Sequence, residues 1–422
     1  MENTKTVVEQ PLNVSRSSGS LSRGLKRWLV SLGPGIITAA VVFGPSKITI
    51  TSKMGAAYGY QLLWVVPVAI FFLIVFTSMS ERIARSINQS LLTTIREKWG
   101  RPVALFIGLG IFLVTASFQA GNSIGVGISV AEWNHSSPVP WVAVFTLAGI
   151  SLLFFRTFYK VLEKVMIFLV VLMLFSFVST LFLAKPPAAE VASGFVPTVP
   201  DGSLGLLIAF MASAFSIVAA FYQCYLVQER KRVNNETQVN ASSSVIGILI
   251  LGFMSAAVLI CAAAVLKAKG INVNSATDIA KALEPVYGRY ATSLFLVGLF
   301  GASFSSLIGN AAIGGTLLGD ALGYGSQLNA KPVRLLIALV MVIGATVAIV
   351  FGKLPLQLIV LAQSVTIFVV PFIGIAMYAI ANDQRIMGKR RNSVSTRIAG
   401  AAGLLVIIAL AIMNIKTLFF NT

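Results

Sequence analysis

Gly44-Pro45-Ser46-Lys47 interrupts the first long apolar segment of the chain, which runs from residue 28 to residue 60. Glycine and proline together disfavour a continuous helix, because proline lacks a backbone donor and clashes with the preceding turn. Such an interruption is tolerated at membrane depth only where the freed backbone groups are buried in protein or line a cavity. The lysine that follows costs about 2.5 to 3.5 kcal/mol when it is placed near a bilayer centre. We therefore expect a functional site at this interruption.

The composition of the whole chain is that of a polytopic membrane protein. Of its 422 residues, 57% are hydrophobic and 11% are charged, and the mean hydropathy is +0.88. The net charge of +18 does not indicate nucleic-acid binding, because no polar stretch is long enough for a binding domain. The single histidine, His135, lies in a short polar loop, so a histidine-based site inside the membrane is excluded. Cys224 and Cys261 show no metal-binding or disulfide pattern, and we expect no cofactor.

Apolar runs of bilayer length predict eleven membrane segments. Basic residues gather in alternate loops, which predicts a multi-pass plasma-membrane protein with a cytoplasmic N-terminus and an extracellular C-terminus. We expect a basic cytoplasmic tail over residues 1–27 and a single transmembrane domain over 28–422. The predicted segments are 28–57, 62–86, 102–131, 139–156, 160–184, 204–228, 242–268, 289–319, 332–352, 355–381 and 395–419.

Eleven segments with an interrupted first one predict two inverted five-helix repeats, 28–184 and 204–381, followed by one extra helix, 395–419. In such transporters the partner interruption lies five segments later, within 204–228. The middle of that segment contains neither glycine nor proline, so periodicity alone does not predict an interruption there. The stretch 87–99 fits either a short amphipathic surface helix or an ordinary linker.

The polar groups expected inside the membrane are neutral, apart from Lys47. All 14 carboxylates fall at helix ends or in loops, whereas a hard divalent cation usually needs at least one as a ligand. Gln119 and Asn122 share one helical face. Ser306 and Asn310 belong to a second polar stripe, which fits either a binding site or contacts between helices.

Residues 32–35 (Leu-Gly-Pro-Gly) and 55–65 closely resemble the first two helices of the NRAMP family. That family comprises proton-coupled transporters of divalent transition metals with the LeuT-type inverted-repeat fold. The resemblance implies an all-α membrane protein with eleven transmembrane helices, of which helices 1 and 6 are discontinuous. Segment count and loop charge agree along the whole chain.

The motifs of the family are altered where they bind metal. The family has Asp-Pro-Gly-Asn at the helix 1 interruption, where this chain has residues 44–47. The family motif of helix 6, Met-Pro-His or Ala-Pro followed by an aromatic residue, aligns with residues 219–221. The acidic residues of the proton path in helix 3 align with Gln119 and Asn122, and the helix 10 glutamine is retained as Gln363.

Each of these changes removes negative charge or a metal ligand, so we expect a small inorganic anion as the substrate. The free N–H groups and the positive dipole end of a half-helix favour an anion, and Lys47 adds a positive charge. Bicarbonate is the first expectation, while nitrate, formate and other small carboxylates stay open. The predicted site comprises Gly44, Pro45, Ser46, Lys47, Ala219, Ala220, Phe221, Gln223, Gln119, Asn122 and Gln363.

Two other functions stay open beside the anion transporter. One is a divergent NRAMP-type transporter for Mg²⁺ or Mn²⁺, and the other is a transport-inactive sensor or scaffold that kept the fold. Na⁺ coupling through backbone carbonyls and hydroxyls fits the fold, and we expect a monomer in the lipid bilayer. We expect no enzyme, because the chain has no Ser/His/Asp or Cys/His arrangement.

Overall fold

The structure is a computed structural model and describes residues 33–155, 158–234, 241–267, 270, 288–351 and 356–419. Regular structure in these residues is helical. The predicted tail at 1–27 lies outside them. The helices are α2 (Gly33–Val42), α3 (Pro45–Tyr58), α4 (Val65–Ser86), α5 (Leu91–Trp99), α6 (Arg101–Asn134), α7 (Pro138–Leu152), α8 (Phe158–Ala184), α9 (Ala188–Ser193), α10 (Leu204–Ala214), α11 (Ile217–Asn234), α12 (Ala241–Val265), α14 (Arg289–Leu322), α15 (Lys331–Phe351), α16 (Leu356–Asn382), α17 (Gln384–Met387), the 3₁₀ helix η2 (Gly388–Arg390) and α18 (Val394–Phe419).

Each predicted membrane segment coincides with a helix or a pair of helices. Within the described residues, eight helices are long and apolar enough to cross a membrane, or ten if each of two bent pairs is one span. Helix α7 has only 15 residues. A multi-pass membrane protein is therefore confirmed, whereas the count of eleven and the repeat boundaries stay predictions.

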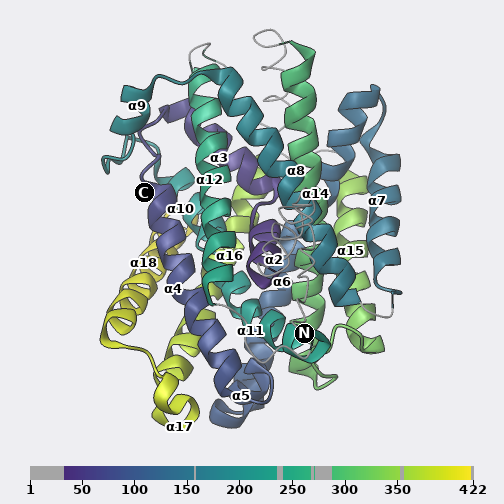
Figure 1. Ribbon diagram of the computed structural model, residues 1–422, viewed down its shortest axis with the longest axis vertical. Coiled ribbons are helices and arrows are strands. Elements are labelled where there is room, and N and C mark those ends of the chain that lie inside the picture. Colours follow the sequence, from purple (N-terminus) through teal and green to yellow (C-terminus); the bar gives the residue numbers. More distant parts are fainter. Residues whose placement is uncertain are drawn as a thin grey trace, which may run out of the picture.

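The interrupted first helix occupies the middle of the bundle (Figure 1). Helix α2 contacts α8, α11, α12 and α14, and α3 packs mainly against α12. Helices α6 and α14, each 34 residues long, pack along each other and flank this centre. Helices α7 and α18 lie at opposite edges of the bundle in Figure 1.

Two glycines allow α12 to approach both halves of the interrupted helix. A Cβ atom on Gly55 of α3 would lie 2.4 Å from the carbonyl oxygen of Leu259. A Cβ atom on Gly247 of α12 would lie 2.4 Å from the backbone of Gly35. Small residues at such crossings let helix backbones pack closely, which is how membrane helices associate without a hydrophobic driving force.

The surface of the bundle carries large apolar side chains, as a lipid-facing surface requires. Phe154 is 78% exposed, Phe182 is 76% exposed and Leu335 is 72% exposed. Helix α5 resolves the alternatives left for residues 87–99, since it forms a short helix. Its first turn is capped by Ser90, whose hydroxyl accepts a hydrogen bond from the Thr93 N–H at 3.0 Å. Helices α5 and α17 lie at one end of the bundle and α9 lies at the other (Figure 1).

Candidate functional site

The first interruption lies at Phe43 and Gly44, as the sequence predicted. Helix α2 ends at Val42 and α3 begins at Pro45, with a bend of 62° between them. Gly44 has an extended backbone, and its carbonyl accepts the first helical hydrogen bond, from Ile48 at 3.1 Å. Proline suits this first helical position because its missing N–H has no partner to lose there. Pro45 therefore leaves no backbone N–H without a hydrogen-bond partner at this interruption.

A second interruption separates α10 from α11 at Phe215 and Ser216. The fold thus has a discontinuous helix 6, although no proline marks it. The interruption precedes residues 219–221, which the resemblance aligned with the family motif, and those residues are helical. Helix α11 starts with a hydrogen bond from the Ala220 N–H to the Ser216 carbonyl at 3.0 Å. Alanine is the best helix former, so Ala219 and Ala220 favour the helical conformation there.

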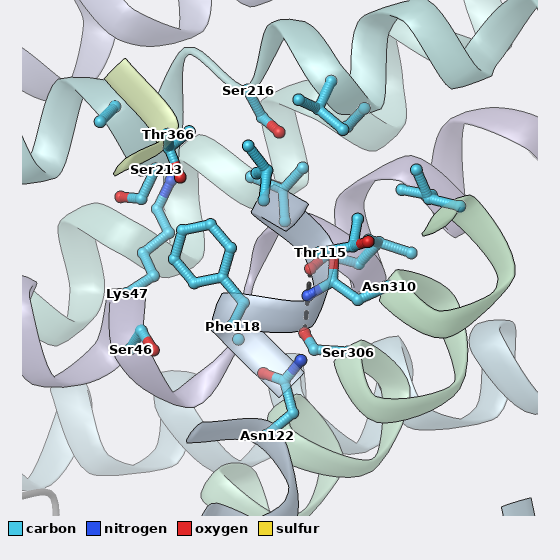
Figure 2. Close-up of a pocket in the computed structure, with 18 of the residues that line it drawn as sticks. Ser46, Lys47, Thr115, Phe118, Asn122, Ser213, Ser216, Ser306, Asn310 and Thr366 are labelled. Carbon is cyan, nitrogen blue, oxygen red and sulfur yellow. Dashed lines mark hydrogen bonds between the residues drawn. The ribbon is translucent and has the colours of Figure 1, made fainter. Parts of the chain in front are cut away.

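A pocket of about 580 Å³, which includes some open space, lies between the two interruptions. Helices α2, α3, α6, α10, α11, α14 and α16 contribute to its wall (Figure 2). Its polar side chains among the described residues are Ser46, Lys47, Thr115, Asn122, Ser213, Ser216, Ser306, Asn310 and Thr366.

Three hydroxyl groups of this pocket donate their protons to backbone carbonyls. Ser306 donates to the Val41 carbonyl at 2.9 Å. Thr115 donates to the Phe112 carbonyl and Ser213 to the Phe210 carbonyl, each at 2.9 Å. A hydroxyl has one proton and two lone pairs, so these three oxygens keep lone pairs for a ligand.

Asn122 presents an oxygen to the pocket for a similar reason. Its amide nitrogen donates to Gln119 Oε1 at 3.4 Å, and Gln119 in turn donates its own amide to the Leu307 carbonyl at 2.8 Å. The Asn122 Oδ1 atom then faces the interruption, 3.3 Å from where a Cβ on Gly44 would stand. The long contact from Asn122 to Gln119 leaves the Asn122 Oδ1 atom beside Gly44 as an acceptor.

Lys47 lies on another part of the wall. It is 2% exposed, and among the described residues its ammonium group has no hydrogen-bond partner. The Nζ atom lies 5.1 Å from the centre of the Phe210 ring, a cation–π distance. In Figure 2 the side chain extends toward Ser213 and Thr366, with the Phe118 ring between it and Asn310.

Five predicted site residues line the pocket: Gly44, Ser46, Lys47, Asn122 and Ala219. They come from α3, α6, α11 and the first interruption, so the structure brings these distant segments together as expected.

Five other predicted residues do not line the pocket in the described part of the chain. Gln119 lies behind Asn122 and orients it. Pro45, Ala220 and Phe221 are buried in helix contacts, and Gln223 belongs to a separate polar cluster with Thr38, Glu81 and Ser244. The side chain of Gln363 lies outside the described residues.

No motif in the sequence singles out Thr115, Ser213 and Ser216. Single hydroxyls in apolar helices are also common as contacts between helices. Ser306 and Asn310 had a usable signal, because they share one helical face and carry the polar stripe into the pocket.

Curated relatives match almost the full length of the chain. The divalent metal cation transporter MntH of Deinococcus radiodurans is 26% identical over 92% of this chain and 90% of its own. The MntH protein of Bacillus subtilis is 26% identical over 88% of each chain. The natural resistance-associated macrophage protein 2 homolog of Dictyostelium discoideum is 26% identical over 99% of this chain and 68% of its own.

A crystal structure of the Eremococcus coleocola manganese transporter superposes on this chain with a TM-score of 0.73. The match covers 95% of this chain and 88% of that one at 16% identity, which shows a shared fold. The LeuT-type NRAMP fold that the sequence predicted is thereby confirmed.

The expected anion substrate is contradicted by these relatives, which are named as divalent metal cation transporters. Bicarbonate and the other small inorganic anions are therefore withdrawn as substrates and partners. Beside Lys47, the pocket holds three hydroxyl oxygens, of Thr115, Ser213 and Ser306, that keep lone pairs as acceptors, which a count of charged residues does not register.

The family model for natural resistance-associated macrophage protein-like proteins matches residues 35–417. The match includes both interruptions, the pocket between them and the last helix, α18. The chain belongs to this family.

Proposed function

We propose that this chain is a membrane transporter for a hard divalent metal cation, Mg²⁺ or Mn²⁺, which binds in the pocket between the two helix interruptions. The observation that carries the proposal is the direction of the hydrogen bonds there. Ser306, Thr115 and Ser213 all donate into backbone carbonyls, and Asn122 donates to Gln119. Their oxygens are left as acceptors, and hard cations bind oxygen ligands.

The ligands of this proposed site are neutral, which favours a cation that keeps part of its hydration shell. Mg²⁺ gives up water reluctantly and usually keeps several water ligands when it is bound. The enclosed cavity measures about 60 Å³, and one water needs about 10 to 15 Å³ on the same measure. The pocket therefore has room for a cation with a few waters, whose O–H groups can donate hydrogen bonds to the hydroxyl and amide oxygens.

The side chain of Lys47 is placed so that it does not block this binding mode. Its ammonium group lies over the Phe210 ring, and the Phe118 ring separates it from Asn310 in Figure 2. We assign the cation to the side of Phe118 that holds Asn122, Ser306 and Asn310. Lys47 still repels a cation in the pocket, so we expect weak binding and transport at high metal concentration.

The orientation in the membrane remains part of this proposal. We place the end with α5 and α17 in the cytoplasm, because the basic clusters near Arg85, Arg96 and Arg390 lie there. The chain would then have a cytoplasmic N-terminus and an extracellular C-terminus in the plasma membrane.

Metal uptake into proteoliposomes tests the proposed function. A trapped metal-sensitive dye should report entry of Mn²⁺ or Mg²⁺ that protein-free liposomes do not show. We expect Asn122→Leu to slow uptake by about tenfold and Ser306→Ala by somewhat less, since each removes one neutral oxygen ligand. Ser151→Ala is the matched control, because this exposed hydroxyl on α7 donates only to the Leu147 carbonyl.

Two outcomes count against the proposal. If the purified wild-type protein carries neither metal, the transport-inactive sensor or scaffold is favoured instead. If it carries metal but Asn122→Leu and Ser306→Ala both retain the wild-type rate, the cation binds elsewhere.

A further inference from the structure

A carboxylate that the sequence placed at a helix end is buried between helices. Glu81 lies in the second-last turn of α4 and is only 2% exposed. It does not line the pocket for the cargo. Buried carboxylates in membrane helices are costly and mark functional sites by default.

Glu81 is held by donors from two other helices. Its Oε1 atom accepts a hydrogen bond from the Ser244 hydroxyl of α12 and one from the Gln223 amide of α11, the latter at 3.2 Å. The same Gln223 amide also donates to Ser244 at 2.8 Å. The Gln223 carbonyl oxygen accepts from the Thr38 hydroxyl of α2 at 2.6 Å. We call these four residues the Glu81 cluster.

The Glu81 cluster joins the two half-helices that form the pocket wall. Thr38 lies on α2, which ends at the first interruption, and Gln223 lies on α11, which begins after the second. Ser80 adds a further link, since its hydroxyl donates to the Phe221 carbonyl of α11 at 3.4 Å. A movement of α11 relative to α4 therefore changes the bond from Gln223 to Glu81, and a movement of α2 relative to α11 changes the bond from Thr38 to Gln223.

We propose that Glu81 is a proton-binding site, and that its protonation favours movement of α2 and α11 and so makes metal transport dependent on pH. The proposal rests on the proposed transport function for its link to metal, but not for proton binding itself. In the intact cluster, the hydrogen bonds from Ser244 and Gln223 offset part of the cost of burying the ionised carboxylate. When α11 moves away from α4, the Gln223 donor is lost and the buried charge is less well stabilised, so the neutral acid is favoured. By linkage, a proton that binds the rearranged state more tightly shifts the equilibrium toward that state.

The surroundings of the cluster favour a proton over a metal ion as its ligand. Glu81 has no second carboxylate, histidine or cysteine beside it in the cluster, and no group of three or more such metal ligands occurs in the described residues. A proton can reach the other carboxylate oxygen, Oε2, which lies 3.7 Å from the Arg85 guanidinium. The Arg85 side chain is 35% exposed at the end of the bundle that carries α5, so the proton comes from water on that side and returns to it.

Among the described residues, Arg85 is the charged group that forms an ion pair with Glu81, at 3.7 Å. Helices α2, α10, α12 and α16 pack around this region and carry no charged side chain in their sequences. Arg390 of η2 turns its guanidinium to the Arg85 carbonyl at 2.9 Å, and Arg82 of α4 turns to Asn392 at 2.7 Å. The other charged residues on elements packed against α4 are Glu229, Arg230, Lys231, Arg232, Arg385, Lys389, Arg397 and Lys416.

The test compares the pH profile of Mn²⁺ uptake in wild-type and Glu81→Gln proteoliposomes. Between about pH 5 and about pH 8 we expect the wild-type rate to change by about fivefold or more, and the Glu81→Gln rate to stay nearly constant. Glutamine mimics the shape of the neutral acid, so a loss of pH dependence with retained transport separates titration from folding. Glu163→Gln is the matched control, because Glu163 is also a buried carboxylate but faces Arg230 at 4.0 Å, and it should keep the wild-type profile.

A second variant keeps the test decisive if Glu81→Gln does not fold. Ser244→Ala removes one donor to the ionised carboxylate, so the midpoint of the pH profile should move upward by about half to one pH unit. A wild-type rate that is independent of pH, or a Glu81→Gln profile equal to that of the wild type, overturns the proposal. So does a Ser244→Ala midpoint that stays in place or moves downward.

A metal-free measurement distinguishes failure of this proposal from failure of the transport function. In detergent, the carbonyl stretch of a protonated carboxylic acid can be followed by infrared difference spectroscopy as the pH is lowered. We expect a band that is present in the wild type and in Glu163→Gln but absent in Glu81→Gln. If that band appears and no metal is transported, proton binding stands and the transport function fails; if the band is absent, the proton site fails whatever the metal assay shows.

Discussion

Removing the charge of Lys47 should strengthen metal binding. Lys47 is 2% exposed on the wall of the pocket, and its ammonium group has no hydrogen-bond partner among the described residues. Its described electrostatic contact is with the Phe210 ring at 5.1 Å. Lys47→Met keeps an unbranched side chain of similar length that can pack against the same ring. The substitution thus removes a repulsive charge at little cost in packing.

The distance between the ammonium group and the bound ion sets the expected magnitude. We take about 5 Å for two charges that share one pocket. Charges of +1 and +2 at about 5 Å repel by about 1.7 kcal/mol in water and by about 6.6 kcal/mol at an effective dielectric constant of about 20. A bound ion that keeps its waters is screened toward the lower value. Since 1.4 kcal/mol corresponds to a tenfold change, we expect Lys47→Met to bind Mn²⁺ about ten to a hundred times more tightly.

Isothermal titration calorimetry of the detergent-solubilised protein measures this change in Kd. Lys53→Met is the matched control, because Lys53 lies on the same helix and does not line the pocket. Lys47→Arg keeps the charge and should show no gain. The electrostatic reasoning is refuted if Lys47→Met binds Mn²⁺ with wild-type affinity, or if Lys53→Met gains as much.

Three further substitutions test other parts of the structure. Asn122→Asp adds a carboxylate ligand at the pocket and should lower the Mn²⁺ Kd by about tenfold or more in the same titration, whereas an unchanged Kd would remove Asn122 from the site. Tyr225→Phe removes the hydroxyl that donates to Asp320 at 2.7 Å and should lower the free energy of unfolding by about 1 to 3 kcal/mol; a variant as stable as the wild type in denaturant titrations would show that this bond adds nothing. Hydrogen bonding from Lys98 lowers the pKa of Asp383 below its usual value of 3.8. The depressed pKa means that this pair stabilises the protein above pH 3.8 and that its contribution, under about 1 kcal/mol for so exposed a pair, is lost as the pH falls through the lowered pKa. Asp383→Asn should therefore remove that part of the acid dependence of unfolding, and an identical pH profile for the variant would contradict the assignment.

The first interruption could be predicted from the sequence because its cause is local. Gly44 and Pro45 act on the backbone directly, whatever packs around them, and α3 begins at Pro45 as expected. The second interruption has no such cause. Phe215 and Ser216 are compatible with a helix, and Phe215 stacks on Phe72 of α4 with ring centres 5.2 Å apart. The position of the second interruption therefore depends on packing against another helix, which cannot be predicted from the local sequence.

For the carboxylates, too, the sequence predicts one property and the packing determines another. Their count and their places near helix ends follow from the sequence, and that inventory led us to exclude a buried acid. Glu81 is nevertheless enclosed, because α11 and α12 pack over the end of α4 and supply Gln223 and Ser244 as donors. Position along a helix does not determine burial when neighbouring helices extend past that position.

The sequence by itself determined that the chain is a multi-pass membrane protein of the NRAMP-like fold with a break at Gly44, since apolar length and proline chemistry are properties of short segments. Only the tertiary structure decided which polar groups of the pocket find their hydrogen-bond partner on another helix. A hydroxyl or an amide can be either donor or acceptor, and its role depends on the group that takes its proton. For Ser306 that group is the Val41 carbonyl, 265 residues away in the chain, and for Gln119 it is the Leu307 carbonyl, 188 residues away. Such partners exist only once the helices have packed together.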